Sequence, residues 1–166
     1  MVEYLSQQQL KRLLDLAKAP RDSLLLRVQY ETGCTVSELV GIARKDILDD
    51  RILIEHRPCF VSASLLRDLH RYLTTHQSPY LFCSRQSPQL TSKRVQQIVK
   101  KYLRRLDPDI DKKTPHLLRY THIAHALAKR IPLKDIMGQT GLKPMRMAQL
   151  AEELGPTRGG YGGMLS

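Results

Sequence analysis

The chain has 166 residues and a formal net charge of +11 at pH 7, with 42% apolar and 5% aromatic residues. This length suits one domain with a proper hydrophobic core. No apolar run approaches the roughly 18 to 20 residues that a membrane span needs, and no secretory signal opens the chain, so we expect a cytoplasmic protein without membrane contacts. Cys34, Cys59 and Cys83 are widely separated, which favours buried apolar roles over a disulfide framework or a zinc site.

The first half of the chain predicts helices interrupted by a small hairpin. Ser6 and Gln9 form a capping-box pattern ahead of apolar residues at helical spacing, so a first helix should follow Ser6 and end before Pro20. Two apolar and β-branched runs flank His56-Arg57-Pro58 and predict antiparallel strands there. The expected helices cover residues 22–31, 36–42 and 64–75, and the expected strands cover 51–55 and 59–61.

The second half is expected to be helical after a short extended piece at residues 80–82. A helix over residues 93–105 should begin at Thr91 or Ser92, and a later one should open on Thr114 as N-cap with Pro115 in the first helical position. The remaining helices should cover 132–137 and 144–154, separated by a break at 138–141. The prediction is therefore a mainly α domain over residues 1–154 with one small antiparallel β-sheet, followed by a flexible glycine-rich tail at 155–166.

The positive charge is concentrated in one block of the sequence. Residues 93–134 hold twelve Lys/Arg and three Asp, a net of +9 out of +11, whereas the rest of the chain is nearly neutral. A merely solvated helix would interleave acids as i,i+4 partners, and residues 93–105 contain none. Such clustering is typical of a protein that binds nucleic acid.

Two helices within this block offer groups that suit a phosphate. His116 and Arg119 are three residues apart, so they share one face near a helix N-terminus. On the preceding helix Lys93, Lys100 and Arg104 share one side. The apolar residues of that helix should turn inward, namely Val95, Ile98, Val99 and Leu103.

Several segments, in their order and residue sequence, resemble those of the catalytic domain of tyrosine recombinases, the phage-integrase and Xer-like enzymes. The resemblance extends from about residue 4 to residue 154. Thr32 to Ile42 is similar to the TGLR-(I/V)-SEL segment of that family, and Thr114 to Tyr120 is similar to its (S/T)PHxLRH box. Residues 133–142 lie where the family has LxxI…LLGH, and residues 147–151 fall on TTQIY. An HxxR pattern alone is weak, but all these segments in order are specific.

The resemblance implies a catalytic set of which this chain keeps little. Two arginines, a hairpin lysine and two His (or His/Trp) groups would hold the scissile phosphate, and a tyrosine would attack it. Here the first arginine position is Thr35, the second histidine position is Leu142, and the nucleophile position is Ala151. His56 or Arg57 is the nearest basic substitute for the hairpin lysine. His116 and Arg119 remain.

Loss of the nucleophile and of at least two phosphate donors favours a catalytically inactive domain that binds duplex DNA, as an accessory or regulatory factor in recombination or genome maintenance. Each missing donor to a developing oxyanion typically costs about 10² to 10³ in rate. We expect no metal and no cofactor. The candidate DNA contacts are Arg57, Lys93, Arg94, Lys100, Lys101, Arg104, Lys112, Lys113, His116 and Arg119, with Arg105 adding to the field.

Two alternatives stay open. An active recombinase could use a relocated nucleophile such as Tyr161, although a glycine-rich tail is poorly suited to near-attack geometry. Alternatively, the domain could have kept only a protein-interaction role, with the basic block binding a polyanion other than DNA. His122 and His125 are three residues apart, as in some metal pairs, but no third ligand at suitable spacing is visible. A single RGG segment at Arg158 is weak support for RNA binding.

The resemblance also implies an N-terminal helical domain that closes a clamp around DNA, and these 166 residues do not contain it. A half-clamp should bind duplex DNA more weakly and with steep salt dependence, because phosphate contacts dominate. A homo-oligomer or a partner protein could supply the other half. When bound to DNA, the protein would be associated with the nucleoid, which lies in the cytoplasm.

Overall fold

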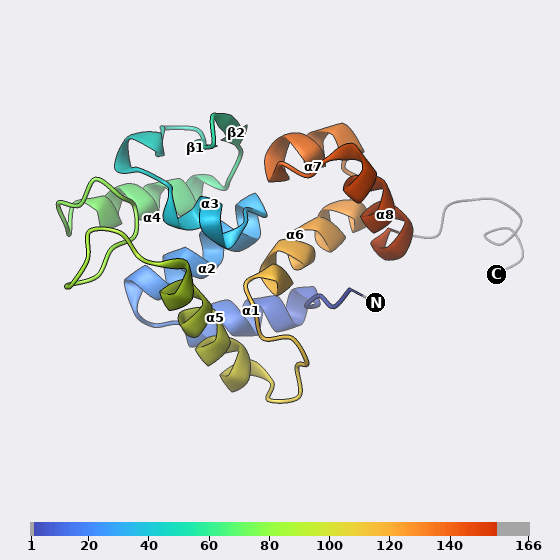
Figure 1. The fold of residues 1–166 in the computed structure, drawn as a ribbon, viewed down its shortest axis with the longest axis horizontal. Helices are drawn as coiled ribbons and strands as arrows, with labels where there is room; N and C mark the ends of the chain where they lie inside the picture. The colour runs from blue at the N-terminus through green and yellow to red at the C-terminus, as the bar shows by residue number, and fades with distance from the viewer. Residues whose placement is uncertain (1, 156–166) are drawn as a thin grey trace, which may run out of the picture.

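The computed structural model describes residues 2–155 and confirms a mainly helical domain with one small antiparallel sheet (Figure 1). The elements follow in chain order: α1 Gln7–Leu16, α2 Pro20–Thr32, α3 Val36–Val40, the 3₁₀ turn η1 Arg44–Asp46, β1 Ile52–Ile54, β2 Arg57–Cys59, α4 Ala63–Leu73, α5 Ser92–Leu106, α6 His116–Ala128, α7 Leu133–Thr140 and α8 Pro144–Leu154.

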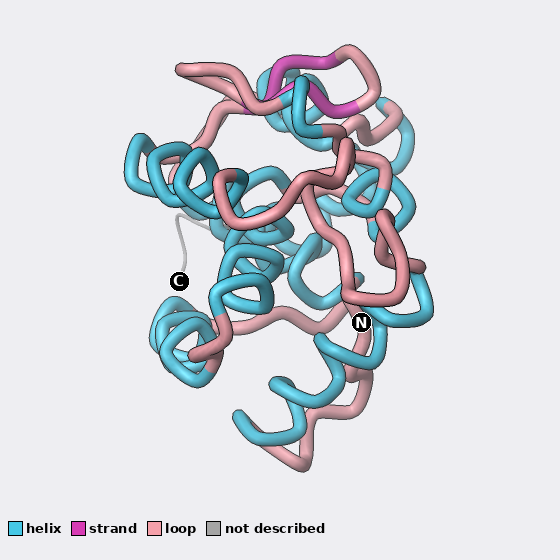
Figure 2. Tube along the Cα trace, turned by 90° about the vertical axis from the view of Figure 1, so that its left-hand side faces the viewer, coloured by secondary structure: helices cyan, strands magenta, loops and turns pink. Residues whose placement is uncertain are grey.

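The helix α2 lies at the centre and packs against α6 and α4, while α5 packs against α1 and α3 (Figure 1). The hairpin sits at one end of the molecule, as the turned view in Figure 2 shows, and β2 contacts α7. A large core cluster joins the first six helices and the hairpin, and a smaller one joins α6, α7 and α8. The basic helix α5 and the N-terminus of α6 are therefore held on one shared framework.

The start of α1 follows its sequence signal closely. Ser6 accepts a hydrogen bond from the Gln9 backbone N–H, and the Gln9 side chain accepts one from Ser6 N, so the capping box is confirmed. The second helix is longer than predicted because Pro20 occupies its first turn, where a missing N–H costs nothing. It ends at Gly33, whose φ of 67° is readily adopted only without a side chain.

The hairpin is tighter than predicted. Ile54 pairs with Arg57, so only Glu55 and His56 form the turn, both with positive φ, and Arg57 and Pro58 belong to β2 rather than to the turn. Positive φ at both central residues suits the twist of a two-residue hairpin. The expected extended piece at residues 80–82 is short, with Tyr80 bridging to Ala43.

Two helix ends in the second half were predicted wrongly. Thr114 makes no side-chain cap: Pro115 already has helical φ and ψ and stands as the N-cap of α6. The α7 helix continues through Gly138 to Thr140, because the left-handed residue that ends it is Gly141. Among residues 2–155 no helix combines the length and apolar character needed to cross a membrane.

Two histidines of α6, the buried His125 and the half-buried His122, contact the N-terminal segment and α2. His125 lies between the Leu5 carbonyl oxygen, 2.8 Å from Nε2, and the Tyr30 hydroxyl, 2.8 Å from Nδ1. His122 Nδ1 lies 2.6 Å from the Tyr30 carbonyl oxygen. Burial lowers the pKa of both, that of His122 to about 4 from an ordinary 6.5. These contacts explain the pair without a metal, and no group of three or more candidate metal ligands clusters anywhere in residues 2–155.

We expect acid to destabilise the fold through His122. The unfolded chain takes up a proton below pH 6.5 whereas the folded chain resists it down to about pH 4, so stability present at neutral pH should be lost across that window. The loss from this group should reach about 3 kcal/mol. In urea unfolding at several pH values, the free energy of unfolding should depend less on pH for His122→Asn than for the unmodified protein. His56→Asn, an exposed turn residue, is the control, and an identical profile for both variants would contradict this assignment.

Candidate nucleic-acid interface

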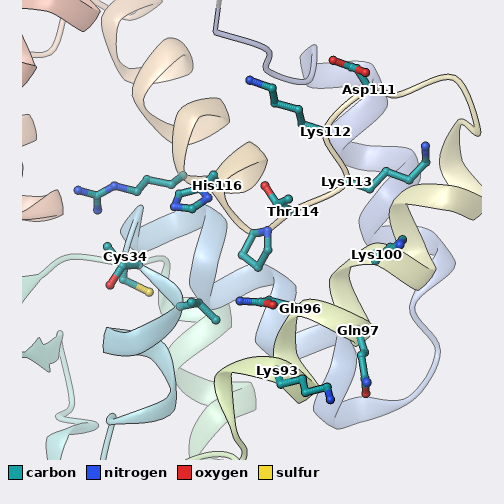
Figure 3. Close-up of a pocket in the computed structure, with 14 residues that line it drawn as sticks. Cys34, Lys93, Gln96, Gln97, Lys100, Asp111, Lys112, Lys113, Thr114 and His116 are labelled. Atoms are coloured by element: carbon teal, nitrogen blue, oxygen red, sulfur yellow. The ribbon is translucent and has the colours of Figure 1, made fainter.

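An open pocket of about 810 Å³ lies between α3, α5, the loop 107–115 and the first turns of α6. We call it the basic groove. Figure 3 shows Lys93, Gln97 and Lys100 along α5 with His116 across from them. The lining residues are Cys34, Thr35, Val36, Lys93, Gln96, Gln97, Lys100, Asp111, Lys112, Lys113, Thr114, Pro115, His116 and Arg119. Six of the predicted DNA contacts therefore meet in one place.

The α5 helix divides its cations between two faces. Val95, Ile98, Val99 and Leu103 are buried, as predicted, together with Tyr102 and Leu106. That burial turns Lys93 and Lys100 into the groove. Arg104 follows one turn later on the same side of the helix but does not line the groove.

The other three cations of α5 lie on its flank, about a quarter turn away from the groove. Lys101 and Arg105 lie over the Tyr102 ring, with 4.8 Å from Lys101 Nζ and 5.7 Å from Arg105 Cζ to its centroid. Arg94 contacts Gln97. The predicted contacts Arg94 and Lys101 therefore do not line the groove, nor does Arg105, although all three stay exposed on the same helix.

Arg119 has both a structural and an exposed side. Its Nη1 donates to the Gly33 carbonyl oxygen at 2.6 Å and to the Thr140 carbonyl oxygen at 2.9 Å, so it ties together the ends of α2 and α7. Within the described residues its Nε and Nη2 have no hydrogen-bond partner. Burial lowers the pKa of the guanidinium, yet arginine remains charged at any physiological pH. The remaining donors can therefore bind an anion.

The loop between α5 and α6 forms the opposite wall of the groove. Lys113 Nζ donates to the carbonyl oxygens of Pro108 and Ile110 at 2.7 and 2.6 Å, which fixes the loop while keeping the charge. The Lys112 backbone N–H donates to Glu3, so the N-terminal segment braces the same wall. His116 is exposed and stacks on Tyr120.

Arg57, predicted as a DNA contact, does not line the groove. Its Nη1 and Nη2 bind Glu38 at 2.6 and 3.0 Å, and its Nε donates to the Gln139 carbonyl oxygen. Burial alone would raise the pKa of Glu38, but hydrogen bonds from Arg57 and Thr35 outweigh it and hold that pKa below its usual value. The pair is a partly buried link between α3, the hairpin and α7. His56, the other candidate on the hairpin, is exposed in the turn.

The three substituted positions have structural roles. Thr35 caps α3 by accepting from the Glu38 N–H at 3.2 Å, and its own N–H donates to the Glu38 carboxylate. Leu142 and Ala151 pack against the small core cluster of α6, α7 and α8. Leu142 and Ala151 carry apolar side chains, and Thr35 lines the groove with a neutral hydroxyl instead of a guanidinium. Tyr161 and residues 156–166 of the expected tail lie outside the described residues.

Sequence reasoning missed the polar side chains between the lysines. Gln96 and Gln97 line the groove beside Lys93 and Lys100. Their spacing could have placed them there: Gln96 is three residues after Lys93 and four before Lys100, on one helix face. Asp111 also lines the groove and brings negative charge to its rim.

Comparison with known proteins identifies the family of the chain. The Phage integrase family matches residues 3–150. The chain is 28% identical over 159 residues to the tyrosine recombinase XerA of Pyrococcus horikoshii, covering 88% of this chain and 55% of that protein. It thus spans about half the length of the curated relatives it matches.

Solved structures share the fold. A XerA recombinase crystal structure superposes with a TM-score of 0.81 at 22% identity, covering 99% of this chain and 63% of the other. A XerH site-specific recombinase bound to its difH substrate gives 0.79 at 19% identity, covering 92% and 50%. The chain belongs to the phage integrase family and has the fold of a tyrosine recombinase catalytic domain.

Proposed function

We propose that this domain binds duplex DNA through the basic groove without cutting it. The observation that carries the proposal is the convergence of Lys93, Lys100, Lys112, His116 and Arg119 on one open pocket. Lysine and arginine side chains arranged along a groove neutralise backbone phosphates, and the release of counterions drives binding. A solved relative of the same fold, XerH, is described as bound to its difH substrate.

The groove is suited to the DNA backbone more than to a small anion. Its cations come from α5, from the loop and from α6, so they spread along the pocket rather than enclosing one point. Gln96 and Gln97 add neutral donors and acceptors between the lysines. Such contacts fix the position of a duplex and carry little sequence information by themselves.

The lack of catalysis follows from the same positions. A covalent mechanism needs a positioned nucleophile and donors aimed at the developing charge. The position that matches the family nucleophile is Ala151, and Thr35 and Leu142 replace two phosphate-binding groups. We therefore propose an accessory or regulatory role in recombination or genome maintenance. An active enzyme with a relocated tyrosine remains the competing proposal.

DNA binding should fall steeply with salt. Fluorescence anisotropy with a labelled 30-base-pair duplex should give a linear log–log plot of affinity against salt with a slope of several units, because about 0.9 counterions leave for each neutralised phosphate. With heparin present as a competitor, the protein should still bind duplex DNA more tightly than single-stranded DNA. No binding at low salt would overturn the proposed function.

Catalysis is tested with a nicked suicide duplex, which traps a covalent protein–DNA adduct in an active tyrosine recombinase. We expect no adduct on a denaturing gel. The Tyr161→Phe variant serves as the control: an adduct that the unmodified protein forms and this variant lacks would establish the competing proposal.

Replacing Arg119 should lower both stability and affinity. The change Arg119→Ala removes two charge-assisted hydrogen bonds to buried carbonyl oxygens, so the free energy of unfolding in urea should fall by about 2 to 3 kcal/mol. DNA affinity of the folded fraction should weaken only partly, since Arg119 is one charge among several. Lys100→Ala, on the exposed face of α5, is the control and should reduce affinity with unchanged stability. Equal stability of the two variants would contradict the structural role of Arg119.

A further inference from the structure

A cation of α8 continues the line of phosphate-binding groups beyond the basic groove. Arg146 Nη2 lies 3.3 Å from the Tyr120 hydroxyl oxygen, and its Cζ lies 5.9 Å from the Tyr120 ring centroid. The Tyr120 ring in turn stacks on His116, with 6.4 Å between ring centroids. His116, Tyr120 and Arg146 thus form one row of contacts across α6 and α8, and His116 lines the groove together with Arg119. Arg146 does not line the groove itself.

The charge of Arg146 is not compensated. Its only recorded hydrogen bonds within residues 2–155 go to Tyr120 and to the Gln149 side chain, both neutral and both at 3.3 Å. No carboxylate oxygen of the described residues lies within 4 Å of it, in contrast to Arg27 or Arg57. Bonds of this length are weak, so the guanidinium can leave them for a stronger acceptor at little cost.

The position of Arg146 also gives little to the fold. It lies in the first turn of α8, where the helix dipole disfavours a cation by some tenths of a kcal/mol. Met147 and Leu150 anchor α8 in the small core cluster, and Arg146 is not a member of that cluster. The guanidinium also lies over the Tyr120 ring, but its hydrogen bonds are long and its charge is unfavourable at this end of the helix.

Resting on the proposed function, we propose that Arg146 and the Tyr120 hydroxyl bind a backbone phosphate of the duplex next to the one held at His116 and Arg119. A guanidinium binds a phosphate through two parallel N–H donors, and a phenol donates a third hydrogen bond. The ring between His116 and Arg146 fixes the spacing of the two phosphate sites. The helix that carries the nucleophile in the related enzymes would here carry a positive contact for the DNA backbone.

The test compares Arg146→Ala with Arg67→Ala in DNA binding and in urea unfolding. Arg67 is an exposed arginine of α4, which packs on α2 and does not line the groove, so its replacement removes the same charge elsewhere. Arg146→Ala should weaken duplex binding about 5- to 10-fold near 100 mM salt and lower the salt slope by about one unit. Its stability should be unchanged or slightly higher. Tyr120→Phe, which keeps the stack, should weaken binding about 2-fold.

Each result decides the inference. If Arg146→Ala and Arg67→Ala have the same DNA affinity and the same salt slope, the inference is overturned. The proposed function would survive that result, because the unmodified protein would still bind DNA. A parallel loss of stability and affinity would also overturn it, because it would make Arg146 a structural residue. Absence of binding by the unmodified protein would remove the proposed function itself and this inference with it.

Discussion

Burial of the apolar stripe of α5 is the constraint on which the rest of the interface depends. Val95, Ile98, Val99 and Leu103 are inaccessible to solvent or nearly so, and burying side chains of this size stabilises a fold by about 1.5 to 3 kcal/mol each. The buried apolar stripe fixes the rotation of α5 about its axis, and this rotation determines which cations face the groove. A helix with six cations and no acid repels itself, so its order depends on this packing against α1 and α3.

Arg119 couples the groove to the framework beneath it. By donating to Gly33 and Thr140 it holds the ends of α2 and α7 beside the first turns of α6. The nearby Arg57–Glu38 pair holds the hairpin and α3 to α7 in a similar way. Both arginines of this region therefore serve the fold, and only Arg119 also borders the groove. Under the proposed function, Arg119 would serve both the fold and a DNA phosphate, whereas Arg57 would serve the fold alone.

Much of this could be predicted from the sequence because the signals were local or segmental. The capping box at Ser6, the inward stripe of α5 and the ordered family segments all follow from residue spacing. Residue spacing could not predict which way the long charged side chains point in the folded protein. Arg57, a predicted DNA contact, does not line the groove and binds Glu38, a residue nineteen positions away that becomes its neighbour only in the folded chain. Arg94, Lys101 and Arg105 were grouped with the groove lysines because net charge carries no orientation. Arg146 was overlooked because it stands alone in sequence, and only the packing of α8 on α6 brings it to Tyr120.

The central claim is that the groove face of α5, rather than its overall charge, holds the DNA. The direct test compares the triple variant K93A/K100A/R104A with R94A/K101A/R105A, which removes the same charge from the flank of the same helix. Duplex affinity measured by anisotropy at fixed salt should fall at least about 30-fold for the groove variant, with a salt slope lower by about two to three units. The flank variant should stay within about 3-fold of the unmodified protein. Equal losses in the two variants, or a larger loss on the flank, would contradict the account.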